Sequence, residues 1–210
     1  MDDGTKERIA QTTKGFDFVL HDMCMNKDWG EVRSCVKVFA NTAKVPSQTT
    51  AGAGAGDLPI HLALFYSCPQ DVAEALIHAY PECVTIPNSK NQYPLQLALG
   101  AENASAIYNA EFLIALITPE TAQGINTYGE TAVMAAVSKD FSVALISSLI
   151  EAYPGALQIP DEMDNLPLHE AIEHGRNANI IQLVYDAYPA ATTIENGMGE
   201  IVEGFWTTQD

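Results

Sequence analysis

The sequence predicts an all-α protein in which short helix pairs repeat along the chain. The first observation is a phrase of apolar residues that recurs with steps of 35, 38 and 35 residues, counted from Pro59 to Pro94, Ala132 and Pro167. The second is another phrase in phase with it, Ala-Tyr-Pro or Ile-Thr-Pro, whose prolines are Pro81, Pro119, Pro154 and Pro189. Two independent markers that share one rhythm indicate structural repeats.

Each repeat is typical of two helices followed by a loop. Proline fits the first helical turn, where its missing N–H would have no partner, so Pro59, Pro94 and Pro167 predict helix starts. The short helix after each start is apolar on nearly all sides, as expected when neighbours cover it. A second helix follows with apolar residues at helical spacing, such as Val72 and Leu76, and ends at the next proline. One such unit cannot bury its apolar faces alone, so stacking of about five helix pairs must supply the core.

The chain is expected to divide into an array of repeats and its ends. Residues 1–15 are a predicted tail, and residues 16–42 a degenerate helix pair whose polar residues suit a cap. Residues 43–56 form a Gly/Ala-rich connector, residues 57–200 hold four repeats, and residues 201–210 form a C-terminal cap or tail. Phe205 and Trp206 either cover the apolar end of the last repeat or anchor a partner.

The repeated phrase resembles a known signature. Residues 58–63, Leu-Pro-Ile-His-Leu-Ala, and residues 166–171, Leu-Pro-Leu-His-Glu-Ala, are similar to the Thr-Pro-Leu-His-x-Ala signature of ankyrin repeats, with Leu in place of Thr. The period exceeds the usual 33 residues, Gln96 and Met134 replace histidine, and the third repeat lacks its proline. The Ala-Tyr-Pro ending and longer connectors are similar to divergent ankyrin-like repeats associated with unicellular algae.

The resemblance implies an ankyrin-like helical solenoid with extended connectors, and roles for individual residues. Its structural signature falls on Pro59, His61, Pro94, Pro167 and His169, and the histidine is expected to bond neighbouring loops. A partner surface would combine the connector tips with the outward side of each first helix. The candidates at the connectors are Asn88, Lys90, Asn91, Asn126, Tyr128, Asp161, Glu162 and Asp164, and those on the helices are Leu62, Leu97, Ala135 and Glu170.

The charge of the chain bears on the kind of partner. With 27 acids and 10 bases the formal net charge is −17, and no cluster of Lys and Arg could form a phosphate-binding face. This disfavours nucleic acid and would steer a protein with a basic surface toward the chain. The acids would equally suit a protein that only needs to avoid self-association.

Protein binding is therefore the predicted function, as a free adaptor or as a permanent subunit of a larger assembly. One alternative is a helical-repeat reader of RNA, since 35 residues is also the period of pentatricopeptide repeats; the charge and the turn residues of the connectors disfavour it. Another is an enzyme whose site lies in residues 44–57. That segment is glycine-rich, but it lacks the Gly-Lys-Ser/Thr ending of a phosphate-binding loop.

The sequence shows no recognisable catalytic motif, no histidines or cysteines at metal-ligand spacing and no sign of a cofactor or small-molecule substrate. The cysteines, Cys24, Cys35, Cys68 and Cys83, are expected to be reduced and mostly buried. No apolar run approaches the roughly 20 residues that span a bilayer. No secretory or transit signal is evident, so the expected location is cytoplasmic by default.

Overall fold

The computed structural model describes residues 16–38, 40–47 and 56–202. These residues are mainly helical and contain no named β-strand, which confirms the predicted all-α class. The nearest approach to a sheet is an isolated antiparallel bridge between Ile125 and Thr131. The chain divides into two compact units, Met1–Tyr108 and Asn109–Asp210.

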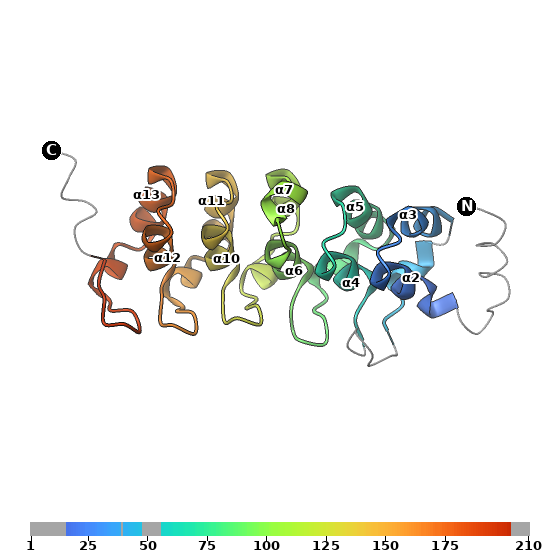
Figure 1. Ribbon diagram of the computed structural model, residues 1–210, viewed down its shortest axis with the longest axis horizontal. Helices are drawn as coiled ribbons and strands as arrows, with labels where there is room; N and C mark the ends of the chain where they lie inside the picture. The colour runs from blue at the N-terminus through green and yellow to red at the C-terminus, as the bar shows by residue number, and fades with distance from the viewer. Residues whose placement is uncertain (1–15, 39, 48–55, 203–210) are drawn as a thin grey trace. The chain divides into compact units, whose positions relative to one another are not determined.

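The first unit contains two layers of helices (Figure 1). The helices α2 (Phe16–Met25), α4 (Pro59–Phe65) and α6 (Pro94–Gly100) pack in succession, and α3 (Trp29–Val38) packs against α5 (Gln70–Ala79). Shorter elements are the 3₁₀ helices η1 (Ala40–Lys44) and η2 (Pro81–Thr85) and the one-turn helix α7 (Ala104–Ile107). Fully buried leucines from several helices fill the core: Leu20, Leu64, Leu76 and Leu95.

The second unit repeats this arrangement. Here α10 (Ala132–Ser138) packs against α12 (Pro167–Glu173), while α11 (Val143–Ala152) packs between α8 (Ala110–Ala115) and α13 (Ala178–Ala187). The short elements are α9 (Pro119–Ala122), η3 (Pro154–Gln158) and η4 (Pro189–Thr193). The core is again aliphatic, with Leu113, Leu145, Ile146 and Leu149 fully buried.

The predicted helix starts are confirmed. The helices α4, α6 and α12 begin at Pro59, Pro94 and Pro167, as the missing proline N–H allows. In the repeat without this proline, α10 begins at Ala132 and is capped by Thr131, whose Oγ accepts a hydrogen bond from the backbone N–H of Met134 at 3.2 Å. Side-chain capping thus replaces the proline in that repeat.

The second set of prolines does more than end helices. The helices α5, α11 and α13 end at Ala79, Ala152 and Ala187, two residues before the proline, and the proline then opens a 3₁₀ helix. The intervening tyrosine has a φ between −146° and −149°, which breaks the helix. The 3₁₀ helices were not expected from the sequence, because a proline after a helical pattern indicates a stop as readily as a new start.

Candidate protein-binding surface

The connectors between repeats share one turn geometry. In each, an Asn or Asp side-chain oxygen accepts hydrogen bonds from the backbone N–H groups two and four residues later, at 2.8 to 3.0 Å. The residues that accept these bonds are Asn88, Asn126, Asp161 and Asn196. Such turns satisfy their own backbone, so they need no partner to hold their shape.

The fourth position of each turn adopts a left-handed backbone. It is Asn91 with φ 60°, Gly129 with φ 75°, Asp164 with φ 59° and Gly199 with φ 75°. Glycine, asparagine and aspartate tolerate this region best. Five of the predicted partner contacts therefore have a structural role in the turns: Asn88, Asn91, Asn126, Asp161 and Asp164.

The third position of each turn projects a side chain into solvent. In the second unit it is Tyr128, Met163 or Met198, with 70%, 63% and 72% of the residue exposed. In the first unit the same position holds the exposed Lys90. We call Tyr128, Met163 and Met198 the turn-tip stripe. Tyr128 and Lys90 were expected from the sequence and the two methionines were not, although each methionine lies two residues after the Asn or Asp of its turn.

The turns of the second unit touch one another. The backbone N–H of Gly197 donates to the carbonyl oxygen of Met163 at 2.9 Å, and Nδ2 of Asn196 donates to Oδ1 of Asn165 at 3.2 Å. A Cβ added to Gly197 would lie 2.5 Å from that carbonyl oxygen. A Cβ on Gly129 would lie 3.2 Å from Cγ of Glu162, so this glutamate reaches the turn that carries Tyr128. The turn-tip stripe therefore lies on one continuous row of turns.

Buried signature histidines form hydrogen bonds that link the first helix of a repeat to the following connector. Nδ1 of His61 accepts from the backbone N–H of Leu58 at 2.9 Å, and its Nε2 lies 2.9 Å from the carbonyl oxygen of Ile86. Because Nδ1 accepts a hydrogen bond, the ring proton is on Nε2, which donates a hydrogen bond to the carbonyl oxygen of Ile86. Burial lowers the pKa of His61, which keeps the ring neutral and this tautomer in place. The histidine is thus structural, as the resemblance implies.

The second signature histidine repeats the pattern. Nδ1 of His169 accepts from the N–H of Leu166 at 2.9 Å, and its Nε2 lies 3.0 Å from the carbonyl oxygen of Ile194. In α6, Oε1 of Gln96 accepts from the N–H of Tyr93 at 3.0 Å and so reproduces the first half of the arrangement. Met134 at this position of α10 has no such acceptor, and Thr131 caps the helix instead.

The helix positions proposed for partner contact are corrected by the structure. Leu62, Leu97, Ala135 and Glu170 are only 2%, 6%, 3% and 8% exposed. The first helices are short and covered on nearly all sides, so these positions face neighbouring side chains instead of solvent. Of the candidate partner contacts in the second unit, those in the turns are left.

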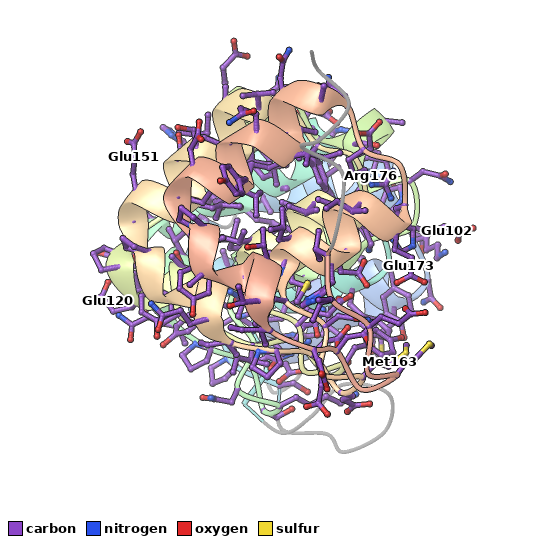
Figure 2. The ribbon with its side chains drawn as sticks, turned by 90° about the vertical axis from the view of Figure 1, so that its left-hand side faces the viewer. Glu102, Glu120, Glu151, Met163, Glu173 and Arg176 are labelled. Atoms are coloured by element: carbon purple, nitrogen blue, oxygen red, sulfur yellow. The ribbon has the colours of Figure 1, made fainter. Side chains whose placement is uncertain are left out.

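The pKa of Glu170 is affected by the charged side chains around α12. Its Oε2 lies 3.3 Å from Nδ1 of His174. Burial raises the pKa of Glu170, and the nearby charges of Asp161, Glu173 and Glu130 raise it further, while His174 opposes the shift. Several acids therefore converge on this part of the unit. Figure 2 shows Met163 and Glu173 on one side of the second unit and Glu120 and Glu151 on the opposite side.

The cysteines and the potential metal ligands add two further observations. The cysteines are buried and free, and burial raises the pKa of Cys68 and of Cys83 to about 12, which keeps these thiols protonated. Among the described residues, no group of His, Cys, Asp and Glu side chains could hold a metal ion. No helix in the described part of the chain has the length and apolar character needed to cross a bilayer.

Two expectations concern residues beyond those described. Phe205 and Trp206 lie outside the described residues, as do residues 48–55 of the segment considered for an enzyme site. At the ends of that segment, Ser47 N–H donates to the carbonyl oxygen of Asp57 and Gly56 N–H to that of Ser47, both at 2.7 Å.

Comparison with known proteins supports the fold. The crystal structure of EF0377, an ankyrin repeat protein, matches with a TM-score of 0.59 and 20% sequence identity, over 85% of this chain and 87% of that chain. No family model matches the sequence, and no curated protein matches it. The chain therefore has an ankyrin-like helical repeat fold.

Proposed function

We propose that this protein is a non-catalytic protein-binding scaffold and that its second unit binds through the turn-tip stripe. The observation that carries the proposal is the exposure of Tyr128, Met163 and Met198, at 70%, 63% and 72%, from the same position of three successive turns. Tyrosine and methionine are enriched in protein interfaces, because they bury a large apolar area on contact.

The rigidity of the turns supports this proposal. Each turn backbone is held by its own Asn or Asp side chain, and the turns at Asp161 and Asn196 are joined by the bond from Gly197 to Met163. A surface that is already ordered loses little conformational entropy on binding. The exposed side chains are thus presented by a backbone that need not rearrange.

The other functions considered have less support. RNA binding needs cations along the phosphates, whereas residues 109–210 contain Lys139 and Arg176 as their only bases. Nothing in the described residues favours catalysis over binding. Free adaptor and permanent subunit are both consistent with the turn-tip stripe, and a cytoplasmic location stays a prediction from the sequence.

Affinity purification from the native cells tests the proposal. The tagged protein is compared with a variant carrying Tyr128→Ser, Met163→Ser and Met198→Ser, at low and moderate salt, with mass spectrometry of the bound proteins. Since only exposed side chains change, we expect both to fold alike, which thermal unfolding checks. A stoichiometric protein should be retained by the original chain and lost from the variant.

A matched control changes exposed apolar residues elsewhere. Val38 and Phe65 are 61% and 58% exposed in the first unit, so Val38→Ser with Phe65→Ser removes similar apolar surface without touching the stripe. This variant should retain the partner. Equal recovery of that partner by the stripe variant, or recovery of RNA in place of protein, would refute the proposal.

A further inference from the structure

We infer that the occupant of the turn-tip stripe is a basic polypeptide segment of another protein that also carries apolar side chains. The inference rests on the proposed function and specifies its partner. It combines two features of the same turns, namely exposed apolar side chains at their tips and acidic side chains beside them.

The second unit has a large excess of negative charge. Residues 109–210 contain 15 Asp and Glu against 2 Lys and Arg, a formal charge of −13 out of the −17 of the whole chain. The two bases offset the acids of the turns only in part. Arg176 is half-buried and its guanidinium donates to the carbonyl oxygen of Ser138. Lys139 is half-buried as well, and its charge interacts with that of Glu130. A cationic partner would therefore meet a predominantly negative field.

The acids lie in the turns that carry the stripe. Glu162 and Asp164 flank Met163 in sequence, and both side chains are exposed. Glu195 and Glu200 bracket the turn of Met198 and are also exposed. A Cβ on Gly129 would lie 3.2 Å from Cγ of Glu162, so the Glu162 side chain starts out next to the turn of Tyr128. Exposed acidic residues therefore belong to the same turns as the exposed apolar tips.

The charges that act on Glu170 show that this field extends to α12. Burial is the main cause of the raised pKa of Glu170 and His174 opposes it, but Asp161 and Glu130, which belong to two different turns, also raise it, together with Glu173 of its own helix. Such crowding of like charge is relieved when a cation binds. An acidic segment, or the phosphates of a nucleic acid, would increase the crowding instead. Among polypeptides, the row of turns thus favours basic segments.

Both parts of the partner have a distinct role. Its apolar side chains would cover Tyr128, Met163 and Met198, and this burial supplies most of the affinity. Its Lys or Arg side chains would pair with carboxylates at the rim, which fixes orientation and speeds association. Because rim charges are screened by salt, binding should weaken as ionic strength rises.

Fluorescence anisotropy with synthetic peptides and the full chain tests the inference. The probe is a labelled amphipathic peptide with lysines on one face and leucines on the other. One control peptide replaces the lysines by glutamates, and another replaces the leucines by serines. We expect binding of the first peptide, no binding of the glutamate peptide and much weaker binding of the serine peptide.

Charge variants then locate the contact. The variant Glu162→Gln, Asp164→Asn and Glu195→Gln should bind the lysine–leucine peptide roughly tenfold more weakly at low salt, because three rim carboxylates that would pair with lysines lose their charge. The matched control, Glu111→Gln, Glu120→Gln and Glu151→Gln, removes the same charge from exposed positions outside the turns. It should change the affinity by less than about twofold.

The outcomes separate this inference from the proposed function. Equal weakening by both charge variants, or binding of the glutamate peptide, would overturn the inference, because the turns would then not select basic partners. If no peptide binds while capture of the cellular partner still depends on Tyr128, Met163 and Met198, the inference fails and the proposed function stands. If that capture is independent of the stripe, the proposed function itself fails.

Discussion

The two units of the chain share a repeat architecture but differ in their surfaces. The first unit holds 12 acids and 8 bases, and all four cysteines of the protein. An ion pair with a distance of 2.8 Å between Nη2 of Arg33 and Oδ1 of Asp71 joins α3 to α5, and the ammonium of Lys44 lies over the ring of Tyr80. The second unit holds 15 acids and 2 bases, with no cysteine.

The turn tips show the same difference. The turn of the first unit carries Lys90 where the turns of the second carry Tyr128, Met163 and Met198. All four turns nevertheless keep the same hydrogen bonds, because these depend on an Asn or Asp at the first position and a left-handed residue at the fourth. The side chain at the third position can therefore vary. Its charge and hydrophobicity can differ from repeat to repeat without changing the fold.

The largest expected loss of stability is at His169, which links α12 to the following connector by hydrogen bonds. His169→Ala would leave the buried N–H of Leu166 and the carbonyl of Ile194 without their partner, at a cost of about 2–4 kcal/mol in the free energy of unfolding. Urea unfolding measures it. His61→Ala should cost a similar amount in the first unit, because the bonds are equivalent. His169→Gln should cost less, since Gln96 already fills this position in α6. An alanine variant as stable as the original would contradict the assignment.

The second effect concerns the contact between turns. Gly197→Ala would place a Cβ 2.5 Å from the carbonyl oxygen of Met163. The backbone must shift to relieve this overlap, so we expect a loss of about 1–3 kcal/mol of stability. Thermal unfolding measures the loss, and Gly30→Ala in α3 is the control, because its Cβ would meet nothing within 4 Å. If the two variants were equally stable, the turns of the second unit would not be in close contact.

A smaller, stabilising effect is expected in the repeat that lacks its proline. Ala132→Pro places proline at the first residue of α10, where Pro59, Pro94 and Pro167 stand in other repeats. The free energy of unfolding should rise by about 0.4–1 kcal/mol, because the unfolded chain becomes less flexible.

The control for this change is Ala135→Pro, one turn later. It removes the hydrogen bond from the N–H of Ala135 to the carbonyl oxygen of Thr131, and should cost about 3 kcal/mol. Calorimetric melting of both variants checks the register of the helix. A marked fall in melting temperature for Ala132→Pro would show that Ala132 is not the first helical residue.

The last expected effect is a pH dependence of the first unit. Burial places the pKa of folded His61 below its ordinary value of 6.5, so the unfolded chain binds more protons than the folded chain just below that pH. The stability from this residue is thus complete above the unfolded pKa and is lost as the pH falls through it. Urea unfolding of the original chain and of His61→Gln, at pH about 7.5 and about 5.5, should show a smaller decrease for the variant. An identical decrease would refute the link to His61.

Much of the fold follows from the sequence alone, because proline and apolar periodicity act locally. The starts of α4, α6 and α12 are determined by Pro59, Pro94 and Pro167, and the histidine role by a signature that two of the repeats carry, at His61 and His169. The turns were also recognisable as turns from their Asn, Asp and Pro residues. The negative charge, and with it the expectation of a basic partner, needs no structure either.

Only the tertiary structure decided which of these residues face solvent. Leu62, Leu97, Ala135 and Glu170 could be outward or buried in a helix that is apolar on nearly every side, and contacts with neighbouring elements bury them. Met163 and Met198 look like ordinary core residues in sequence, yet the left-handed residue that follows the tip directs each into solvent. The contact of Gly197 with Met163 joins residues 34 positions apart, which no local pattern specifies. Local chemistry thus determined the repeat, and packing between repeats determined which of its side chains are exposed.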